Sequence, residues 1–349
     1  MYFDYNATSP MSENVWSYLS QYSLLPLNPS APHDHGSKAR KLLEKARHDI
    51  INFLQLNMHD YDVIFTSSAT ESNNMILQSM KHLDIYVSAI EHSSVYKVLN
   101  KKIIKVDLNG LIDFDHLKQI CDLPAKKMIS IGYANGEIGV IQNMEDIKKI
   151  CQNANVFLHT DCTQAIGKVH INFQGYDFIT FSGHKFGGPV GIGVCVFRKN
   201  SLTPLLHGGN QEFGMRAGTE NVLGALGLTY VLCNRNIDSY IEYTMKLRSK
   251  LEDFLLSKAC IVILGYGVNR LSNTVYFISK EHSNEELLMV LDMNNCSVST
   301  GSACLAGINN ISHVVQALKY DRGGIRISFG LNNTLAEVDK LCEILNSVL

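Results

Sequence analysis

The sequence predicts an α/β protein whose central β-sheet is open, mostly parallel and covered by helices on both faces. Short β-rich runs alternate with helical patterns through the first two-thirds of its 349 residues, which is typical of strands joined by helical crossovers. A hydrophobic content of 46% is enough to bury a large core, in one large domain or two smaller ones. Polar motifs follow directly after the predicted strands, where open α/β sheets bind their ligands.

The elements of this first part follow one another at short intervals. The predicted strands are Val63–Thr66, Ile85–Ala89, Lys127–Tyr133, Val156–Thr160, Phe178–Phe181 and Gly193–Phe197. The predicted helices between them are Glu71–Lys81, Val95–Leu99 and Met144–Asn153.

A long helical pattern over Ser239–Lys258 opens a second αβ region. Its predicted strands are Thr274–Ile278, Ser297–Ser299 and Ile325–Ser328, and its other predicted helices are Asn284–Met293, Ile311–Leu318 and Leu335–Leu349. We therefore expect a large domain over residues 13–238 and a smaller C-terminal αβ domain over 239–349, against which residues 1–12 pack.

Charge, hydropathy and cysteine spacing exclude several classes of protein. A formal net charge of −2 gives no field that would recruit nucleic acid, and no apolar run approaches the ~20 residues that span a bilayer. The first residues lack the pattern of a signal peptide, so we expect a cytoplasmic protein. The nine cysteines include no Cys-x-x-Cys pair, and His33 and His35 have no matched ligands, so we expect neither a disulfide framework nor a metal site.

The most informative segment surrounds Lys185. The apolar strand 178–181 runs into Ser182, His184 and Lys185, and glycines that allow close approach to a flat ligand follow. A lysine at a strand end is usually a solvated charge. A partly buried lysine, however, has a lowered pKa and can bond covalently to an aldehyde, while the hydroxyl and imidazole beside it suit a phosphate. The segment therefore suggests pyridoxal phosphate as the cofactor.

Three further strand ends supply groups of the kind that this cofactor uses. Asp161 ends the strand 156–160, where a carboxylate against the pyridine nitrogen would keep the ring an electron sink, and Gln164 could donate to the phenolic oxygen. Residues 66–74 form a turn and a helix start that could bind an anion, although a simple helix cap is equally plausible from the residues alone. His92 could stack on the ring and move a proton, although a lone histidine is more often structural.

Ten segments in family order resemble the pyridoxal-phosphate-dependent cysteine desulfurases of the class V aminotransferase group. They are Asp4–Thr8, Asn28–His33, Thr66–Asn74, Glu91-His92, Gly136–Gln142, Asp161–Gln164, Ser182–Lys185, Arg216–Asn221, Ser299–Cys304 and Arg326–Gly330. The resemblance implies the aspartate-aminotransferase-like fold type I and a homodimer. It also implies a reaction that converts L-cysteine to L-alanine and passes sulfur to an acceptor protein, either an iron–sulfur scaffold or a tRNA-thiolation enzyme.

The resemblance also implies a role for each matching residue. Lys185 is similar to the lysine that bonds to the cofactor, Asp161 to the partner of the pyridine nitrogen, Gln164 to the donor to the phenolic oxygen, and His92 to the stacking histidine. The residues that resemble phosphate ligands are Ala69, Thr70, Ser182 and His184, together with Thr219, which would reach the phosphate bound by the partner subunit. Arg326 resembles the clamp for the substrate carboxylate, a task that suits its bidentate fork.

Cys304 lies in the small-residue segment 299–307, which is a poor core sequence and a good mobile arm. The resemblance implies that its thiolate attacks the substrate sulfur and becomes a persulfide, after proton transfer to a base such as His92.

Four features depart from the family pattern. Gly136 stands where a second asparagine helps to hold the substrate, and Asn135 is the residue that could compensate. Asn210 and Ala217 replace a common glycine and a common serine. The chain stops at Leu349, before the tail that helps bacterial housekeeping members to dock the scaffold, so we expect a different acceptor or weaker docking.

Two alternatives to a cysteine desulfurase stay open. The first is a related lyase or aminotransferase that acts on another small amino acid, and Gly136 is the main reason to consider it. The second is a cofactor-binding partner or scaffold protein with little catalysis. Five residues that resemble the family's functional residues are retained together: Lys185, Asp161, His92, Cys304 and Arg326. Their joint retention disfavours this second alternative, because binding alone needs no persulfide arm.

Overall fold

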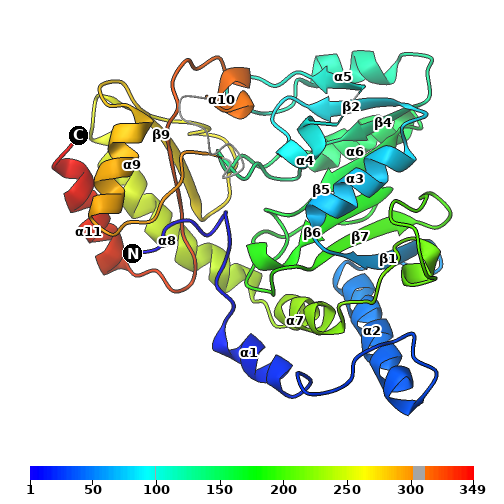
Figure 1. The fold of residues 1–349 in the computed structure, drawn as a ribbon. Coiled ribbons are helices and arrows are strands. Elements are labelled where there is room, and N and C mark those ends of the chain that lie inside the picture. Colours follow the sequence, from blue (N-terminus) through cyan, green and yellow to red (C-terminus); the bar gives the residue numbers. More distant parts are fainter. Residues whose placement is uncertain (99, 302–310) are drawn as a thin grey trace.

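The computed structural model describes residues 1–98, 100–301 and 311–349, which form two β-sheets with separate cores (Figure 1). The larger sheet has seven strands in the order β1-β7-β6-β5-β4-β2-β3. Their bounds are β1 Tyr61–Thr66, β2 Asp84–Ser88, β3 Lys101–Ile104, β4 Lys127–Ser130, β5 Phe157–Asp161, β6 Phe178–Ser182 and β7 Gly193–Arg198. Strands β3, β2, β4, β5 and β6 are parallel, and β7 runs antiparallel to both β6 and β1. The mostly parallel sheet predicted from the sequence is therefore confirmed.

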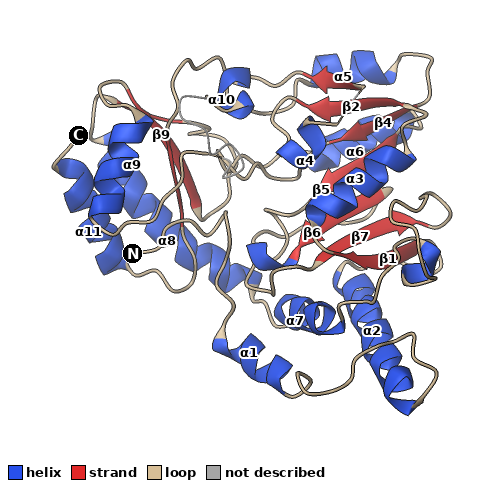
Figure 2. Ribbon diagram, viewed as in Figure 1, coloured by secondary structure: helices blue, strands red, loops and turns tan. Residues whose placement is uncertain are grey.

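Both faces of the large sheet are apolar. Successive residues of a strand point to opposite faces, so neighbouring apolar residues pack into different core clusters. In β1, Val63 and Phe65 pack into one core cluster, and Ile64 packs into another. Figure 2 shows helices on either side of the red strands. The helices of this part are α1 Glu13–Ser20, α2 Asp34–Phe53, α3 Ala69–Ser79, α4 Ser93–Tyr96, α5 Phe114–Cys121, α6 Met144–Asn153 and α7 Val222–Cys233.

Helices α1, α2, α5 and α7 and strand β3 were not predicted, and two of the helices show why. Helix α2 is capped by His33, whose ring accepts a hydrogen bond from Gly36 N, and histidine is not among the usual capping residues. Helix α7 is apolar around most of its circumference and has no polar face, so its sequence lacks the 3.6-residue pattern of an amphipathic helix.

The smaller sheet is antiparallel and has the strand order β10-β9-β8. Its strands are β8 Ile261–Ile263, β9 Thr274–Ser279 and β10 Ile325–Ser328, and the helices of this region are α8 Ile237–Leu256, α9 Asn284–Met293, α10 His313–Ala317 and α11 Leu335–Asn346. The predicted strand Ser297–Ser299 is wrong as a continuous strand: Ser297 and Ser299 each form a single bridge, to Tyr2 and to Arg326. The domain limits at residues 12/13 and 238/239 stay a prediction.

The N-terminal segment, residues 1–9, connects the two sheets (Figure 1). Tyr2 and Asp4 form parallel bridges with Ser297 and Ser328 of the smaller part, and Ser9 N donates to His184 O beside the large sheet. The start of the chain therefore lies between the end of β6 and the small sheet. Among the described residues, no helix has both the length and the apolar character needed to cross a membrane.

Candidate active site

One cavity of about 360 Å³ lies where the large sheet, the N-terminal segment and the small sheet meet. The predicted site residues that line it are Ala69, Thr70, His92, Asn135, Asp161, Gln164, Ser182, His184, Lys185 and Arg326. Thr219 is not among the lining residues and is exposed on the surface of the chain. Cys304 lies outside the described residues. The cavity therefore brings together ten of the twelve residues that the sequence singled out.

Lys185 ends a short 3-10 turn, Gly183–Lys185, that directly follows β6. Its Nζ donates to Asn6 O at 3.0 Å and to Ala7 O at 2.8 Å. Both acceptors belong to the N-terminal segment, so the start of the chain fixes the lysine amine at the cavity wall.

Asp161 is the last residue of β5 and is 8% exposed. Its Oδ1 accepts from Thr163 N at 2.9 Å, and its Oδ2 accepts from Asn73 Nδ2 at 2.8 Å. Asn73 is itself held by Thr180, whose Oγ1 donates to Asn73 Oδ1 at 2.6 Å. These bonds orient the carboxylate and leave each oxygen with lone pairs for a further donor.

His92 is attached to the same network through Ser94. The backbone N–H of Ser94 donates to His92 Nδ1 at 3.1 Å, and Ser94 Oγ lies 2.8 Å from the same nitrogen. Since Nδ1 accepts, the neutral ring carries its hydrogen on Nε2. Loss of hydration lowers the pKa of His92, which favours this neutral form, although Asp161 opposes the shift. His92 can therefore donate from Nε2, and the predicted uptake of a thiol proton would require its contact with the Ser94 amide to break.

The residues predicted to bind phosphate bring hydrogen-bond donors to the lining of the cavity. Thr70 lies in the first turn of α3, where backbone N–H groups lack helical partners. Ser182 is buried, and His184 Nδ1 lies 3.2 Å from Thr8 Oγ1. Loss of hydration, reinforced by nearby Lys185, lowers the pKa of His184 to about 4, so this ring is neutral at pH 7. Together, the first turn of α3, Ser182 and His184 are suited to hydrogen-bond an anion.

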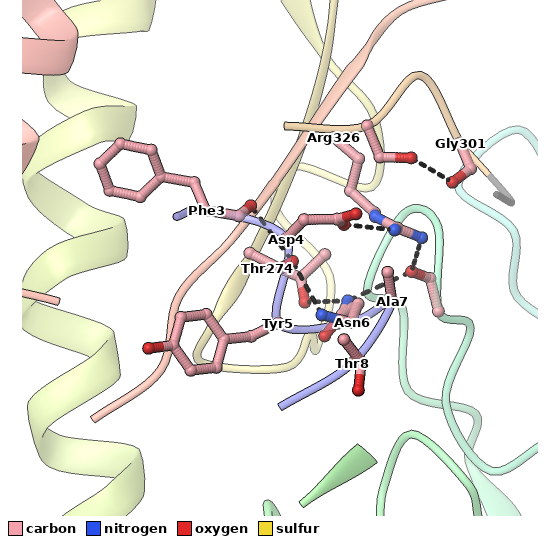
Figure 3. A network of polar contacts seen from close by, with 12 residues as sticks. Phe3, Asp4, Tyr5, Asn6, Ala7, Thr8, Thr274, Gly301 and Arg326 are labelled. Atoms are coloured by element: carbon pink, nitrogen blue, oxygen red, sulfur yellow. Dashed lines mark hydrogen bonds and ion pairs between the residues drawn. The ribbon is translucent and has the colours of Figure 1, made fainter. Parts of the chain in front are cut away.

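Arg326 lies on β10 and lines the cavity, next to Asp4 of the N-terminal segment (Figure 3). Its Nη2 donates to Asp4 Oδ1 at 2.6 Å, and its Nη1 donates to Gly136 O at 3.1 Å. Its Nε is buried and has no acceptor within the described part of the chain. The guanidinium is thus oriented by Asp4 and retains a donor for an incoming carboxylate.

Asn135 lines the cavity, but its side chain serves a local turn. Its Oδ1 accepts from Glu137 N at 2.8 Å and Ile138 N at 2.9 Å, and its Nδ2 donates to Ile90 O at 2.7 Å. Its predicted contact with substrate stays a prediction. At neighbouring Gly136, an added Cβ would lie 2.9 Å from Gln164 Nε2, so the absence of a side chain there makes room for the Gln164 amide.

Several residues that shape the site received no role from the sequence: Asp4, Asn6, Asn73, Glu91, Ser94 and Lys168. Four of these lie inside the family-like segments 4–8, 66–74 and 91–92, so their position in a motif was the available signal. Burial raises the pKa of Glu91 to about 8, and its Oε1 accepts from Gly132 N at 2.8 Å. Among the described residues, no group of three His, Cys, Asp or Glu side chains could hold a metal ion.

The residues of the cavity fit pyridoxal phosphate. An amine (Lys185), a buried carboxylate (Asp161) and the hydrogen-bond donors of Thr70, Ser182 and His184 line the same cavity, and the buried Nε of Arg326 has no acceptor among the described residues. These are the partners that an aldehyde, a pyridine nitrogen, a phosphate and a substrate carboxylate require.

Comparisons with known proteins agree with this chemistry. Residues 1–341 match the sequence profile of the family Aminotransferase class-V. The chain is 33% identical over its whole length to 94% of a cysteine desulfurase IscS from Dictyoglomus turgidum. The crystal structure of a NifS-like protein from Rickettsia africae superposes with a TM-score of 0.94 at 34% identity, over 99% of this chain and 98% of that one. A structure described as SspA in complex with cysteine superposes with a TM-score of 0.79 at 26% identity, over 94% of this chain and 98% of that one. The chain therefore belongs to the class V aminotransferase family, in its pyridoxal-phosphate-dependent cysteine desulfurase group.

Proposed function

We propose that this enzyme converts L-cysteine to L-alanine and collects the sulfur as a persulfide on Cys304. The observation that carries the proposal is the shared cavity of Lys185, Asp161 and Arg326, since it places an amine, a carboxylate and a carboxylate-binding group around one space. Full-length similarity to proteins named cysteine desulfurase, and to a structure that contains cysteine, supports this choice of substrate.

Each group then has a defined task. When bound, pyridoxal phosphate supplies an electron sink that stabilises negative charge at the substrate Cα. The Lys185 amine takes the Cα proton, and the Arg326 guanidinium, oriented by Asp4, binds the substrate carboxylate. His92 would stack on the cofactor and could donate a hydrogen bond from Nε2. The Cys304 thiolate attacks the substrate sulfur, so that an S–S bond forms while the Cβ–S bond breaks; the electron pair of the broken bond remains with Cβ, which takes up a proton and becomes the methyl group of alanine.

The proposal also covers the assembly and the destination of the sulfur. Thr219 is exposed on this chain, which suits the role predicted for it, in which it reaches the phosphate site of a second copy in a homodimer. The sulfur would pass to an acceptor protein, either a scaffold for iron–sulfur clusters or an enzyme of tRNA thiolation, and a cytoplasmic location stays part of this proposal.

Gly136 favours one alternative function, that of a lyase or aminotransferase for another small amino acid. Gly136 has no side chain that could hold a substrate, and its backbone oxygen accepts a hydrogen bond from Arg326. An enzyme of this alternative class would release a keto acid from the substrate rather than alanine.

The experiment compares wild-type protein with Cys304→Ala, both loaded with pyridoxal phosphate. Both should be yellow, and both absorption spectra should change when L-cysteine is added. With an excess of a reducing thiol such as dithiothreitol, which reduces the persulfide to thiol and sulfide, only the wild type should then produce alanine and sulfide over many turnovers. Undiminished alanine production by Cys304→Ala would refute the persulfide role, and keto acid in place of alanine would support the alternative.

A further inference from the structure

Lys168 is a buried amine beside the cavity that the proposed mechanism does not use. Its side chain lies in the turn region after β5 and is 1% exposed. In the ranges that the structure describes, no carboxylate pairs with it, and its Nζ donates to Asn6 Oδ1 at 3.1 Å and to Gln164 Oε1 at 2.9 Å. A fully buried lysine without an anionic partner is unusual, because desolvation opposes its charge.

The surroundings of Lys168 suit a neutral amine. A neutral amine has two hydrogens, which match its two acceptors, whereas an ammonium would carry a third hydrogen in need of a partner. The charged groups that act on it, Lys185, Arg235 and Arg326, are all cations. Together with the loss of hydration, which is the larger cause, they lower the pKa of Lys168 well below its usual value.

Lys168 and the N-terminal segment fix the side-chain amide of Gln164 from two sides. The amine approaches Oε1, and Gln164 Nε2 donates to Asn6 O at 2.9 Å. A donor on one side and a carbonyl on the other specify which atom of the amide is oxygen and which is nitrogen. Nε2 carries two hydrogens, and Asn6 O takes one of them, so a second remains for a ligand in the cavity that Gln164 lines.

Asn6, which lies beside Thr274 in Figure 3, joins Lys168 and Gln164 to the rest of the site. Its backbone oxygen accepts from both Gln164 and Lys185. Its side chain accepts from Lys168 and donates to Gly136 O and Thr274 Oγ1. The amide of Gln164 and the amine of Lys185 are therefore held by the same residue, close to the place where the cofactor would bind.

We propose that Lys168 is a positioning residue: it holds Oε1 of Gln164 so that Nε2 is the atom presented to the ring oxygen of pyridoxal phosphate. The inference rests on the proposed function, in which Gln164 donates to that oxygen. Such a donor stabilises negative charge on the ring oxygen, which then attracts less strongly the proton on the neighbouring nitrogen of cofactor-bound Lys185. Removal of the Lys168 amine should therefore make that nitrogen harder to deprotonate.

The test measures the visible absorption of cofactor-loaded Lys168→Met as a function of pH. The apparent pKa of the band should rise by about one unit relative to the wild type, and the affinity of the cofactor-free protein for pyridoxal phosphate should fall. Lys168→Gln, which retains a neutral N–H donor, should restore most of the wild-type titration. Lys127→Met is the matched control, because Lys127 is also buried and donates to carbonyl oxygens, yet its acceptors, Cys121 and Leu123, do not line the cavity, whereas Gln164 and Asn6, the acceptors of Lys168, do.

An unchanged titration in Lys168→Met, or an equal shift in Lys127→Met, would overturn the inference. If Lys168→Met does not fold, Gly136→Ala provides a second test, because its methyl group would lie 2.9 Å from Gln164 Nε2 and displace the amide. Its band should shift in the same direction, and an unshifted band would again overturn the inference. Failure of the proposed function is distinguishable, since the wild type would then form no alanine from cysteine whatever the behaviour of residue 168.

Discussion

The two walls of the cavity are built in different ways. On the large-sheet wall, Asp161 and Ser182 are the last residues of β5 and β6, and Lys185 follows in the next turn. On the opposite wall, Arg326 of β10 is oriented by Asp4, from the other end of the chain. The groups of the first wall lie in short motifs at or just after strand ends, although Asn6, Ala7 and Asn73 hold them in place. The second wall is formed by pairing between the start and the end of the chain.

This difference indicates which parts of the chain specify the binding of the cofactor and which specify the binding of the substrate. The large-sheet wall carries the groups that suit the cofactor, and short motifs after strands specify it. The second wall carries the group that suits the substrate carboxylate, and the long-range fold specifies it. Substitutions on the first wall should therefore affect cofactor spectra, and substitutions on the second should affect substrate affinity and stability.

The largest expected effect is on the large-sheet wall, at Lys185. Lys185→Ala removes the amine that would bond to the cofactor and move the Cα proton, so turnover of L-cysteine should fall by about 10³-fold or more. Alanine production and the visible spectrum measure the loss. Lys199→Ala is the control, since Lys199 is exposed and lies 3.9 Å from Asp62. A Lys185→Ala protein that keeps wild-type turnover would remove the lysine from the mechanism.

The second effect tests the opposite wall through Asp4→Asn. The variant takes the negative charge from a largely buried ion pair, in which the Arg326 and Asp4 side chains are 4% and 16% exposed. We expect a loss of about 3 kcal/mol in the free energy of unfolding and a raised KM for L-cysteine, with an unchanged cofactor spectrum. Urea unfolding and steady-state kinetics measure the two effects. Asp34→Asn, in an exposed pair with Lys38, should change neither. The reverse pattern, a normal KM with a lost cofactor band, would contradict the division between the walls.

The smallest effect concerns Glu91, which borders the large-sheet wall. Burial raises its pKa from 4.5 to about 8, so between these values the folded protein keeps a proton that the unfolded chain has released. The contribution of this residue to stability is therefore greatest below pH 4.5 and falls as the pH rises towards 8. Glu91→Gln removes this titration, so its free energy of unfolding should exceed that of the wild type by a margin that grows as the pH rises from 4.5 to 8. The free energy of unfolding of both proteins is measured at both pH values. A difference between the two proteins that is the same at pH 4.5 and pH 8 would contradict the prediction.

Strands could be predicted better than helices from the sequence. β4, β5, β6 and β7 are buried strands with apolar, β-rich runs, and all four were predicted within a few residues. Helix α7 has no polar face and α2 has an unusual cap, so neither shows the pattern on which helix prediction depends. The single bridges of Ser297 and Ser299 depend on Tyr2 and Arg326, which lie far away in the sequence.

The candidate site divides in the same way. Lys185, Asp161 and Ser182 could be predicted because each lies at or just after the end of a strand. The pairing of Asp4 with Arg326, and the contact of Asn6 with Lys168, could not be predicted, because the tertiary fold alone brings these residues together. The tautomer of His92 likewise depends on the backbone geometry at Ser94, which no residue pattern specifies.

The most direct test of the central claim, that both walls act on one cysteine molecule, is a single-turnover experiment on the cofactor-loaded wild type. After L-cysteine is added, the visible spectrum should change, and alanine should form in an amount equal to the sulfur bound by the enzyme. A spectrum that does not respond to L-cysteine, or a keto acid formed without alanine, would contradict the account.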